Sequence, residues 1–129
     1  MARVMLVDDE QQIRNMMRKM LENREHTFFE AENGVQALER YREARPDLVI
    51  TDILMPEKGG LALIAEIKKI NPAQRIIAIS GGGKDGKLCF LSTAKAINGV
   101  TTLKKPFTME AFQRTVDEAM GKRYENATA

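Results

Sequence analysis

The chain has 129 residues, 43% of them hydrophobic and 29% charged, which is typical of one globular domain and excludes a disordered or fibrous protein. Its formal net charge of +2 is too small to favour nucleic acid or an anionic membrane surface as a partner. The apolar run before Asp8 and Asp9 is too short for a signal peptide or a membrane span, and the single Cys89 fits a reducing compartment, so we expect a cytoplasmic protein.

Short apolar or β-branched runs alternate along the chain with segments whose apolar residues repeat at helical spacing. The runs predict five strands, at residues 3–7, 27–31, 48–51, 75–79 and 100–103, and the second has the weakest pattern. This alternation favours an α/β fold with a doubly wound parallel sheet.

Helical stripes follow the first, second, third and fifth predicted strands. Thr108 is placed to cap the last helix, and the chain beyond Gly121 is polar. We therefore divide the chain into a domain at residues 1–121 and a polar C-terminal tail at 122–129. The apolar residues of the four stripes are Ile13, Met16, Met17, Met20 and Leu21; Val35, Leu38 and Tyr41; Leu61, Ile64 and Ile67; and Phe112, Val116, Ala119 and Met120.

Polar residues end several of the predicted strands. If the strands are parallel, their carboxyl ends meet at one edge of the sheet, where such folds bind ligands. Clustered carboxylates there need either a raised pKa or a bound cation, and a set of oxygen ligands favours Mg²⁺, or Mn²⁺, over zinc. The residues expected at this edge are Asp8 and Asp9 after the first strand, Asp52 after the third, Ser80 after the fourth, and Lys104, Lys105 and Pro106 after the fifth.

Four separated motifs give this pattern a family resemblance. They are LVDDE at residues 6–10, DILMP at 52–56 with Gly59 and Gly60 behind it, ISG at 79–81, and LKKPF at 103–107. In this order they resemble the receiver domains of two-component response regulators, single-domain chemotaxis regulators included, over residues 2–121. The resemblance implies a flavodoxin-like fold with a five-stranded sheet in the order 2-1-3-4-5, flanked by five helices.

The resemblance also implies the roles of the site residues. Asp52 would accept a phosphoryl group from a phosphohistidine on a histidine kinase or a histidine phosphotransfer protein. Lys105 and Ser80 would contact that group, and the bond between Lys105 and Pro106 would be cis. Phosphorylation would switch contacts with a downstream protein target or an output domain. Asp9, Asp52 and the backbone carbonyl of Leu54 would bind Mg²⁺ directly, while Asp8 would act on the ion mainly through a bound water.

The sequence departs from the family pattern at two places that concern switching. Thr102 stands where many receivers carry an aromatic residue, so an aromatic rotamer switch is excluded. The glycines Gly81, Gly82 and Gly83 follow Ser80, and their backbone freedom suggests a second route. We expect backbone rearrangement of this run to carry the signal from Ser80.

Three other functions remain alternatives. Residues 81–88 nearly match a phosphate-binding loop, but Leu88 replaces the Ser or Thr that would bind Mg²⁺. The chain could also be a pseudo-receiver that only binds partners, or a phosphatase with Asp52 as a turnover nucleophile. The resemblance favours a signalling phosphoacceptor that assists its own phosphorylation and dephosphorylation over a separate enzyme.

Overall fold

The structure is a computed structural model that describes residues 2–21, 26–53, 59–81 and 99–128. The described part contains four helices, and the segment between β4 and β5, where a further helix was predicted, lies outside it. The elements in chain order are β1 (Arg3–Val7), α1 (Gln11–Leu21), β2 (Thr27–Ala31), α2 (Gly34–Ala44), β3 (Leu48–Asp52), α3 (Gly60–Ile70), β4 (Arg75–Gly81), β5 (Val100–Lys105) and α5 (Met109–Thr128).

All five strands are parallel and form one sheet in the order β2-β1-β3-β4-β5, which confirms the predicted flavodoxin-like topology. Three strands extend past their predicted ends, to Asp52, Gly81 and Lys105. The polar residues predicted to follow these strands therefore belong to the hydrogen-bonded sheet. β2 is an edge strand with mostly half-buried residues, and this explains its weak hydrophobic pattern.

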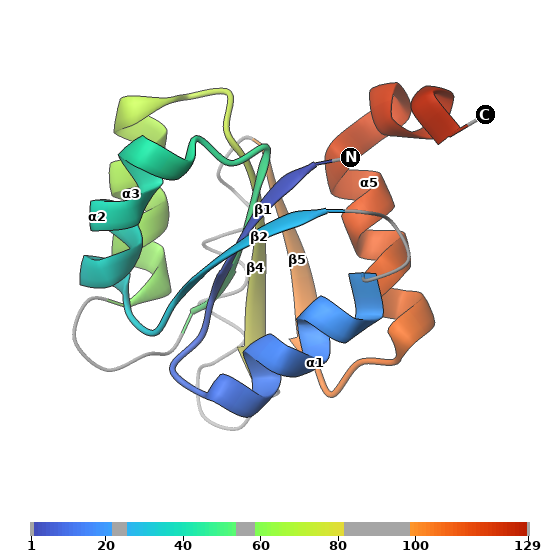
Figure 1. The fold of residues 1–129 in the computed structure, drawn as a ribbon, viewed down its shortest axis with the longest axis horizontal. Coiled ribbons are helices and arrows are strands. Elements are labelled where there is room, and N and C mark those ends of the chain that lie inside the picture. The colour runs from blue at the N-terminus through green and yellow to red at the C-terminus, as the bar shows by residue number, and fades with distance from the viewer. Residues whose placement is uncertain (1, 22–25, 54–58, 82–98, 129) are drawn as a thin grey trace.

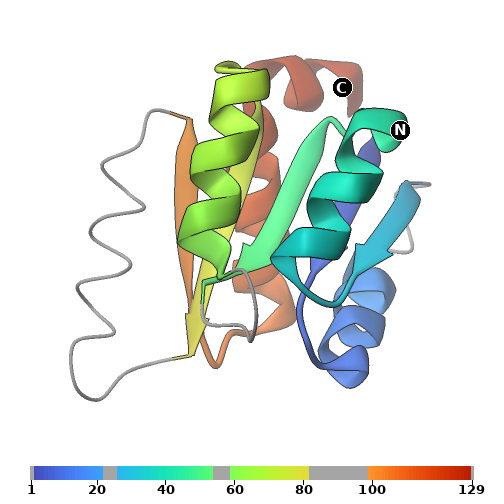
Figure 2. The ribbon, with the colours of Figure 1, turned by 90° about the vertical axis from the view of Figure 1, so that its left-hand side faces the viewer.

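Helices cover both faces of the sheet. α2 and α3 lie on one face, while α1 and α5 lie on the other (Figures 1 and 2). Successive strand residues supply the two cores in turn: Met5 packs with α2 and α3, whereas Leu6 packs with α1 and α5. Burial on both faces accounts for the continuous apolar strands in the sequence.

The start of α5 follows a local capping rule. Thr108 Oγ1 accepts a hydrogen bond from the Ala111 amide at 3.0 Å, as expected for the N-cap of α5. Gly121 has φ 73° and ψ −172°, a non-helical conformation that divides α5 at the point where the polar tail was predicted to begin. None of the helices in the described ranges is long and apolar enough to cross a membrane.

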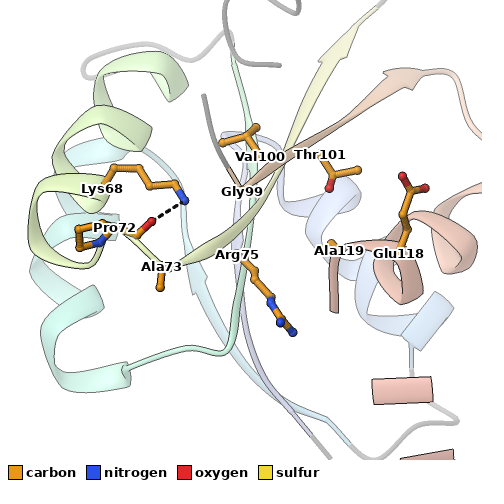
Figure 3. A pocket seen from close by; sticks show the side chains of 9 residues that line it. All are labelled: Lys68, Pro72, Ala73, Arg75, Gly99, Val100, Thr101, Glu118 and Ala119. Carbon is orange, nitrogen blue, oxygen red and sulfur yellow. Dashed lines mark hydrogen bonds between the residues drawn. The ribbon is translucent and has the colours of Figure 1, made fainter. Parts of the chain in front are cut away.

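A cavity of about 400 Å³ lies at the amino edge of the sheet, beside the starts of β4 and β5 (Figure 3). Two cationic residues that line this cavity donate hydrogen bonds to backbone carbonyls. Lys68 Nζ donates to the carbonyls of Gln74 at 2.7 Å and Pro72 at 3.1 Å, and Arg75 donates to the carbonyl of Met120. Burial lowers the pKa of Lys68. These two cations thus hydrogen-bond to backbone carbonyls beside the cavity at the amino edge.

Candidate functional site

Three of the predicted site residues meet at the carboxyl edge of the sheet. Asp8 follows β1 directly, while Asp52 ends β3 and Lys105 ends β5. Lys105 Nζ lies 2.9 Å from Asp52 Oδ2 and 3.5 Å from Asp8 Oδ2. Both acids are buried, with 1% of Asp8 and 7% of Asp52 exposed, so their charges act on each other with little screening by water.

Burial and neighbouring charges shift the pKa values of Asp8 and Lys105. Burial raises the pKa of Asp8 from 3.8 to about 6, and the charges of Asp52 and Asp9 add to the increase. The Glu10 amide, which donates to Asp8 Oδ1 at 2.9 Å, and Lys105 act in the opposite direction. Burial alone would lower the pKa of Lys105, but its hydrogen bond to Asp52 and the charges of Asp52 and Asp8 outweigh burial and raise it. The single ammonium group of Lys105 thus pairs with the carboxylates of both Asp8 and Asp52.

Carboxylate oxygens of Asp8, Asp9 and Glu10 lie within 4.8 Å of one another, which is close enough to bind one cation. Asp8 is buried, whereas Asp9 and Glu10 are exposed. An all-oxygen set with exposed members suits Mg²⁺ or Mn²⁺, which keep several waters. Glu10 was not among the predicted ligands, and Leu54, which was, lies outside the described residues.

Ser80 places a hydroxyl at the same edge. It lies in β4 beside Lys104 of β5 and is 1% exposed. Its Oγ has no hydrogen-bond partner within the described part of the chain. Because a buried hydroxyl without a partner is costly, this atom is suited to donate to an incoming oxygen. Lys104 is exposed, as expected for a neighbour of Lys105 on the opposite face.

The other predicted switch and backbone positions are only partly described. Thr102 is half-buried in β5, beside Ala78 of β4, and Gly81 is the last residue of β4. Gly82 and Gly83 lie outside the described residues. The peptide bond between Lys105 and Pro106 is cis.

Close packing at Gly60 holds the end of β3 against the start of α3. The Gly60 amide donates to the carbonyl of Ile53 at 2.9 Å. A β-carbon on Gly60 would lie 2.2 Å from the carbonyl oxygen of Asp52 and 2.7 Å from Ile53 Cα. Only glycine fits here without movement of the backbone that carries Asp52.

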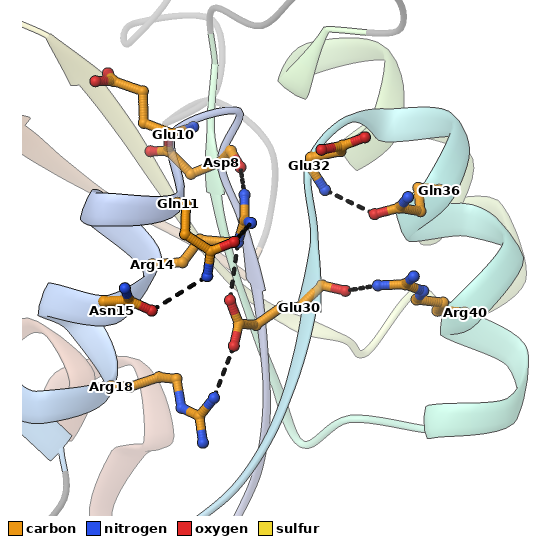
Figure 4. A network of polar contacts seen from close by, with 10 residues as sticks. All are labelled: Asp8, Glu10, Gln11, Arg14, Asn15, Arg18, Glu30, Glu32, Gln36 and Arg40. Carbon is orange, nitrogen blue, oxygen red and sulfur yellow. Dashed lines mark hydrogen bonds and ion pairs between the residues drawn. The ribbon is translucent and has the colours of Figure 1, made fainter.

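Sequence reasoning also missed Arg14, which hydrogen-bonds to the backbone of Asp8. It lies on the sheet-facing side of α1, three residues before Met17 and seven before Leu21, and only 7% of it is exposed. That helical spacing was the signal that could have identified it as buried. Its guanidinium belongs to a polar network that joins α1 to β2 (Figure 4).

Five parallel strands in the order 2-1-3-4-5, with acids and a lysine at their carboxyl ends, define a flavodoxin-like protein with a charged site at the sheet edge. Residues 4–117 match the family model of the response regulator receiver domain. The chain belongs to this family of signalling domains.

Known proteins similar to the chain include chemotaxis regulators of full receiver length. It is 39% identical to the chemotaxis protein CheY of Halobacterium salinarum over 109 residues, covering 84% of this chain and 91% of that one. It is 38% identical to CheY of Bacillus subtilis over 120 residues, covering 89% and 98%. Among solved structures, a response regulator receiver domain protein from Clostridium thermocellum matches with a TM-score of 0.85 at 28% identity, covering 96% of this chain and 98% of that one.

Proposed function

We propose that the protein is a phosphoacceptor response regulator in which Asp52 receives the phosphoryl group. The observation that carries this proposal is the contact at 2.9 Å between Lys105 Nζ and the Asp52 carboxylate, at the carboxyl edge of a receiver-family sheet. A buried carboxylate that is held at a strand end beside a cation is positioned for attack on a phosphorus atom.

In the proposed transfer, a carboxylate oxygen of Asp52 forms a bond to phosphorus while the bond between phosphorus and the histidine nitrogen of the donor breaks. The electron pair of the broken bond leaves with the imidazole. Lys105 then pairs with a phosphoryl oxygen, and the Ser80 hydroxyl donates to another. Asp8 and Asp9 would hold Mg²⁺, together with Asp52 and the Leu54 carbonyl as proposed ligands; the ion supplies charge neutralisation for the phosphoryl oxygens.

The proposed donor is a histidine kinase or a histidine phosphotransfer protein, and the output is a changed contact with a downstream protein or output domain in the cytoplasm. Relatives support a signalling role. The chain covers 89% of the chemotaxis protein CheY of Listeria monocytogenes at 31% identity and 90% of the sporulation initiation phosphotransferase F of Bacillus subtilis at 28% identity. It also matches part of the sensor kinase CckA of Brucella abortus, where it spans 13% of that protein's length.

The proposal also includes the path by which phosphorylation of Asp52 would change the rest of the protein. Thr102 cannot act as an aromatic switch, so the signal would pass from Ser80 through the backbone of the glycines at 81–83. Similar amide-exchange protection of residues 81–87 with and without a phosphoryl mimic would contradict this route.

The test of phosphorylation is the intact mass of the chain after incubation with phosphoramidate or acetyl phosphate. We expect a gain of one phosphoryl group that requires Mg²⁺ and disappears in Asp52→Asn. Lys104→Met is the matched control, because Lys104 is exposed beside the site and should leave phosphorylation unchanged. No gain under any condition would favour a partner-binding pseudo-receiver. Sustained hydrolysis of small phosphate esters that depends on Asp52 would favour the phosphatase.

A further inference from the structure

The buried Arg14 makes three hydrogen bonds with three different partners. Nη1 donates to the backbone carbonyl of Asp8 at 2.5 Å, Nη2 donates to Gln11 Oε1 at 2.8 Å, and Nε donates to Glu30 Oε1 at 2.8 Å. All three nitrogens of the planar guanidinium, Nε, Nη1 and Nη2, donate in these bonds. The bonds therefore fix the orientation of the group. Figure 4 shows the guanidinium between Asp8 and Glu30.

The carbonyl that Arg14 binds belongs to the peptide between Asp8 and Asp9. Its orientation sets the directions in which both acids leave the backbone, and Asp8 and Asp9 supply two of the three clustered carboxylates. We propose that Arg14 is a positioning residue for divalent cations: it fixes the Asp8–Asp9 peptide so that both carboxylates face one ion. This inference rests on the proposed function, since it concerns the cation site of the phosphoacceptor.

Glu30 holds Arg14 in place from the neighbouring strand β2. Its Oε1 accepts from Arg14, while its Oε2 accepts from Arg18 at 2.8 Å. The hydrogen bonds from Arg14 and Arg18 lower the pKa of Glu30 despite its partial burial, so its carboxylate stays charged. Arg18 also donates to this carboxylate, and its side chain is about half exposed. The chain therefore provides a matched control for Arg14.

The positioning role and a simple charge effect predict opposite results. Arg14 carries a positive charge near the acids, so removing that charge would by itself strengthen the binding of a cation. If Arg14 acts by orienting the Asp8–Asp9 peptide, its removal must weaken binding instead. Substitution of a residue that hydrogen-bonds to a metal ligand and orients it commonly lowers the affinity for the metal by about 10-fold to 100-fold.

The experiment measures Mg²⁺ affinity by calorimetry, and Mn²⁺ affinity by electron paramagnetic resonance, in the unphosphorylated chain. We expect Arg14→Met to weaken binding by about 10-fold or more. Arg14→Lys keeps the positive charge but loses the planar guanidinium that binds three partners at once, so it should also weaken cation binding. Arg18→Met should change affinity by less than about twofold, because its exposed charge is screened. Circular dichroism establishes that each variant is folded at the temperature of measurement.

A double-mutant cycle tests the part played by Glu30. If Glu30 acts through Arg14, Glu30→Gln should weaken binding in the natural chain and have little further effect in the Arg14→Lys background. The amide resonance of Glu10, which donates to Asp8 Oδ1, should move in the metal-free Arg14 variants and stay in place in Arg18→Met.

The outcomes separate this inference from the proposed function. If both Arg14 variants are folded and bind Mg²⁺ as tightly as the natural chain, or more tightly, the positioning role is wrong while phosphorylation of Asp52 can still hold. If Arg14→Met does not fold, equal affinity in Arg14→Lys alone overturns the role. A natural chain that neither binds Mg²⁺ nor gains a phosphoryl group would overturn both.

Discussion

Gly60 lies so close to the end of β3 that a β-carbon at this position would come within 2.2 Å of the carbonyl oxygen of Asp52. The atoms that such a β-carbon would meet belong to the backbone, so a flexible side chain cannot move aside to relieve the overlap. The start of α3 and the residue proposed to accept the phosphoryl group are therefore packed as one unit.

We expect Gly60→Ala to reduce the free energy of unfolding by about 1–3 kcal/mol and to displace Asp52, which lowers the rate of phosphorylation. Urea unfolding and intact mass after phosphoramidate treatment measure the two effects. Gly59→Ala is the control, because its β-carbon would meet Ile53 O at an ordinary 3.5 Å. Its cost, as an N-cap change, should stay below about 1 kcal/mol. Equal stability in the two variants would contradict the close-packing argument.

The pKa of Asp8 makes the metal-free protein sensitive to pH. In the folded chain this pKa is about 6, above its ordinary 3.8, so the folded state holds the proton more tightly than the unfolded state. The stabilisation is complete below the ordinary pKa and is lost as the pH rises through about 6. We expect the free energy of unfolding in EDTA to fall by about 1 kcal/mol between about pH 5 and pH 7.

Asp8→Asn should remove most of this slope and stabilise the metal-free protein at neutral pH. The lowered pKa of Glu30 has the opposite effect, with stability lost as the pH falls, but that change lies mainly below its ordinary pKa of 4.5. Urea unfolding of both proteins at the two pH values measures the difference. If the natural chain is more stable at the higher pH, burial of Asp8 does not control how the free energy of unfolding depends on pH.

In the proposed phosphoacceptor, Lys105 and a divalent cation would compete for the carboxylates of Asp8 and Asp52. Lys105→Met leaves Asp8 and Asp52 without the ammonium that contacts them, so we expect a loss of roughly 2 kcal/mol or more in EDTA. Added Mg²⁺ should raise the melting temperature more in this variant than in the natural chain. Lys104→Met, at an exposed neighbouring position, should change stability by less than about 0.5 kcal/mol. A smaller Mg²⁺ effect in Lys105→Met would contradict competition.

A buried hydrogen bond away from the site provides a separate test of the fold. Tyr41 Oη donates to Gln74 Oε1 at 2.5 Å and links α2 to the segment before β4. Tyr41→Phe keeps the ring but leaves the Gln74 oxygen without this donor, so we expect a loss of about 1–2 kcal/mol in urea unfolding. Phosphorylation should be unchanged, because Tyr41 lies near the end of α2 and its hydroxyl bonds to Gln74, just before the start of β4. A loss of phosphorylation at unchanged stability would contradict this separation.

The strand ends were predictable from the sequence because a parallel sheet brings every carboxyl end to one edge. Asp8, Asp52 and Lys105 could therefore be placed together although they are far apart along the chain. The weak hydrophobic pattern at residues 27–31 was still enough to predict a strand there, since an edge strand needs only partial burial.

The contacts made by Arg14 and Gly60 could not be assigned from local patterns. The partners of Arg14 are Glu30, sixteen residues later on another element, and a backbone carbonyl that no sequence motif reveals. The need for glycine at position 60 comes from the distance between two backbones, which is set only when α3 packs on β3. Helical spacing places a side chain on a face but does not identify its polar partners.

Lys68 and Arg75 hydrogen-bond to backbone carbonyls at the amino edge of the sheet, and both ends of the described chain lie there (Figure 1). Ala2 precedes β1, and its carbonyl accepts from the Thr27 amide. Arg75 donates to the carbonyl of Met120, which comes just before the break in α5 at Gly121. A fluorophore, an affinity handle or a sensor surface attached through either end would consequently be separated from Asp52 by the full length of the strands (Figure 1). The protein can thus be immobilised with the edge that carries Asp52 facing the solution.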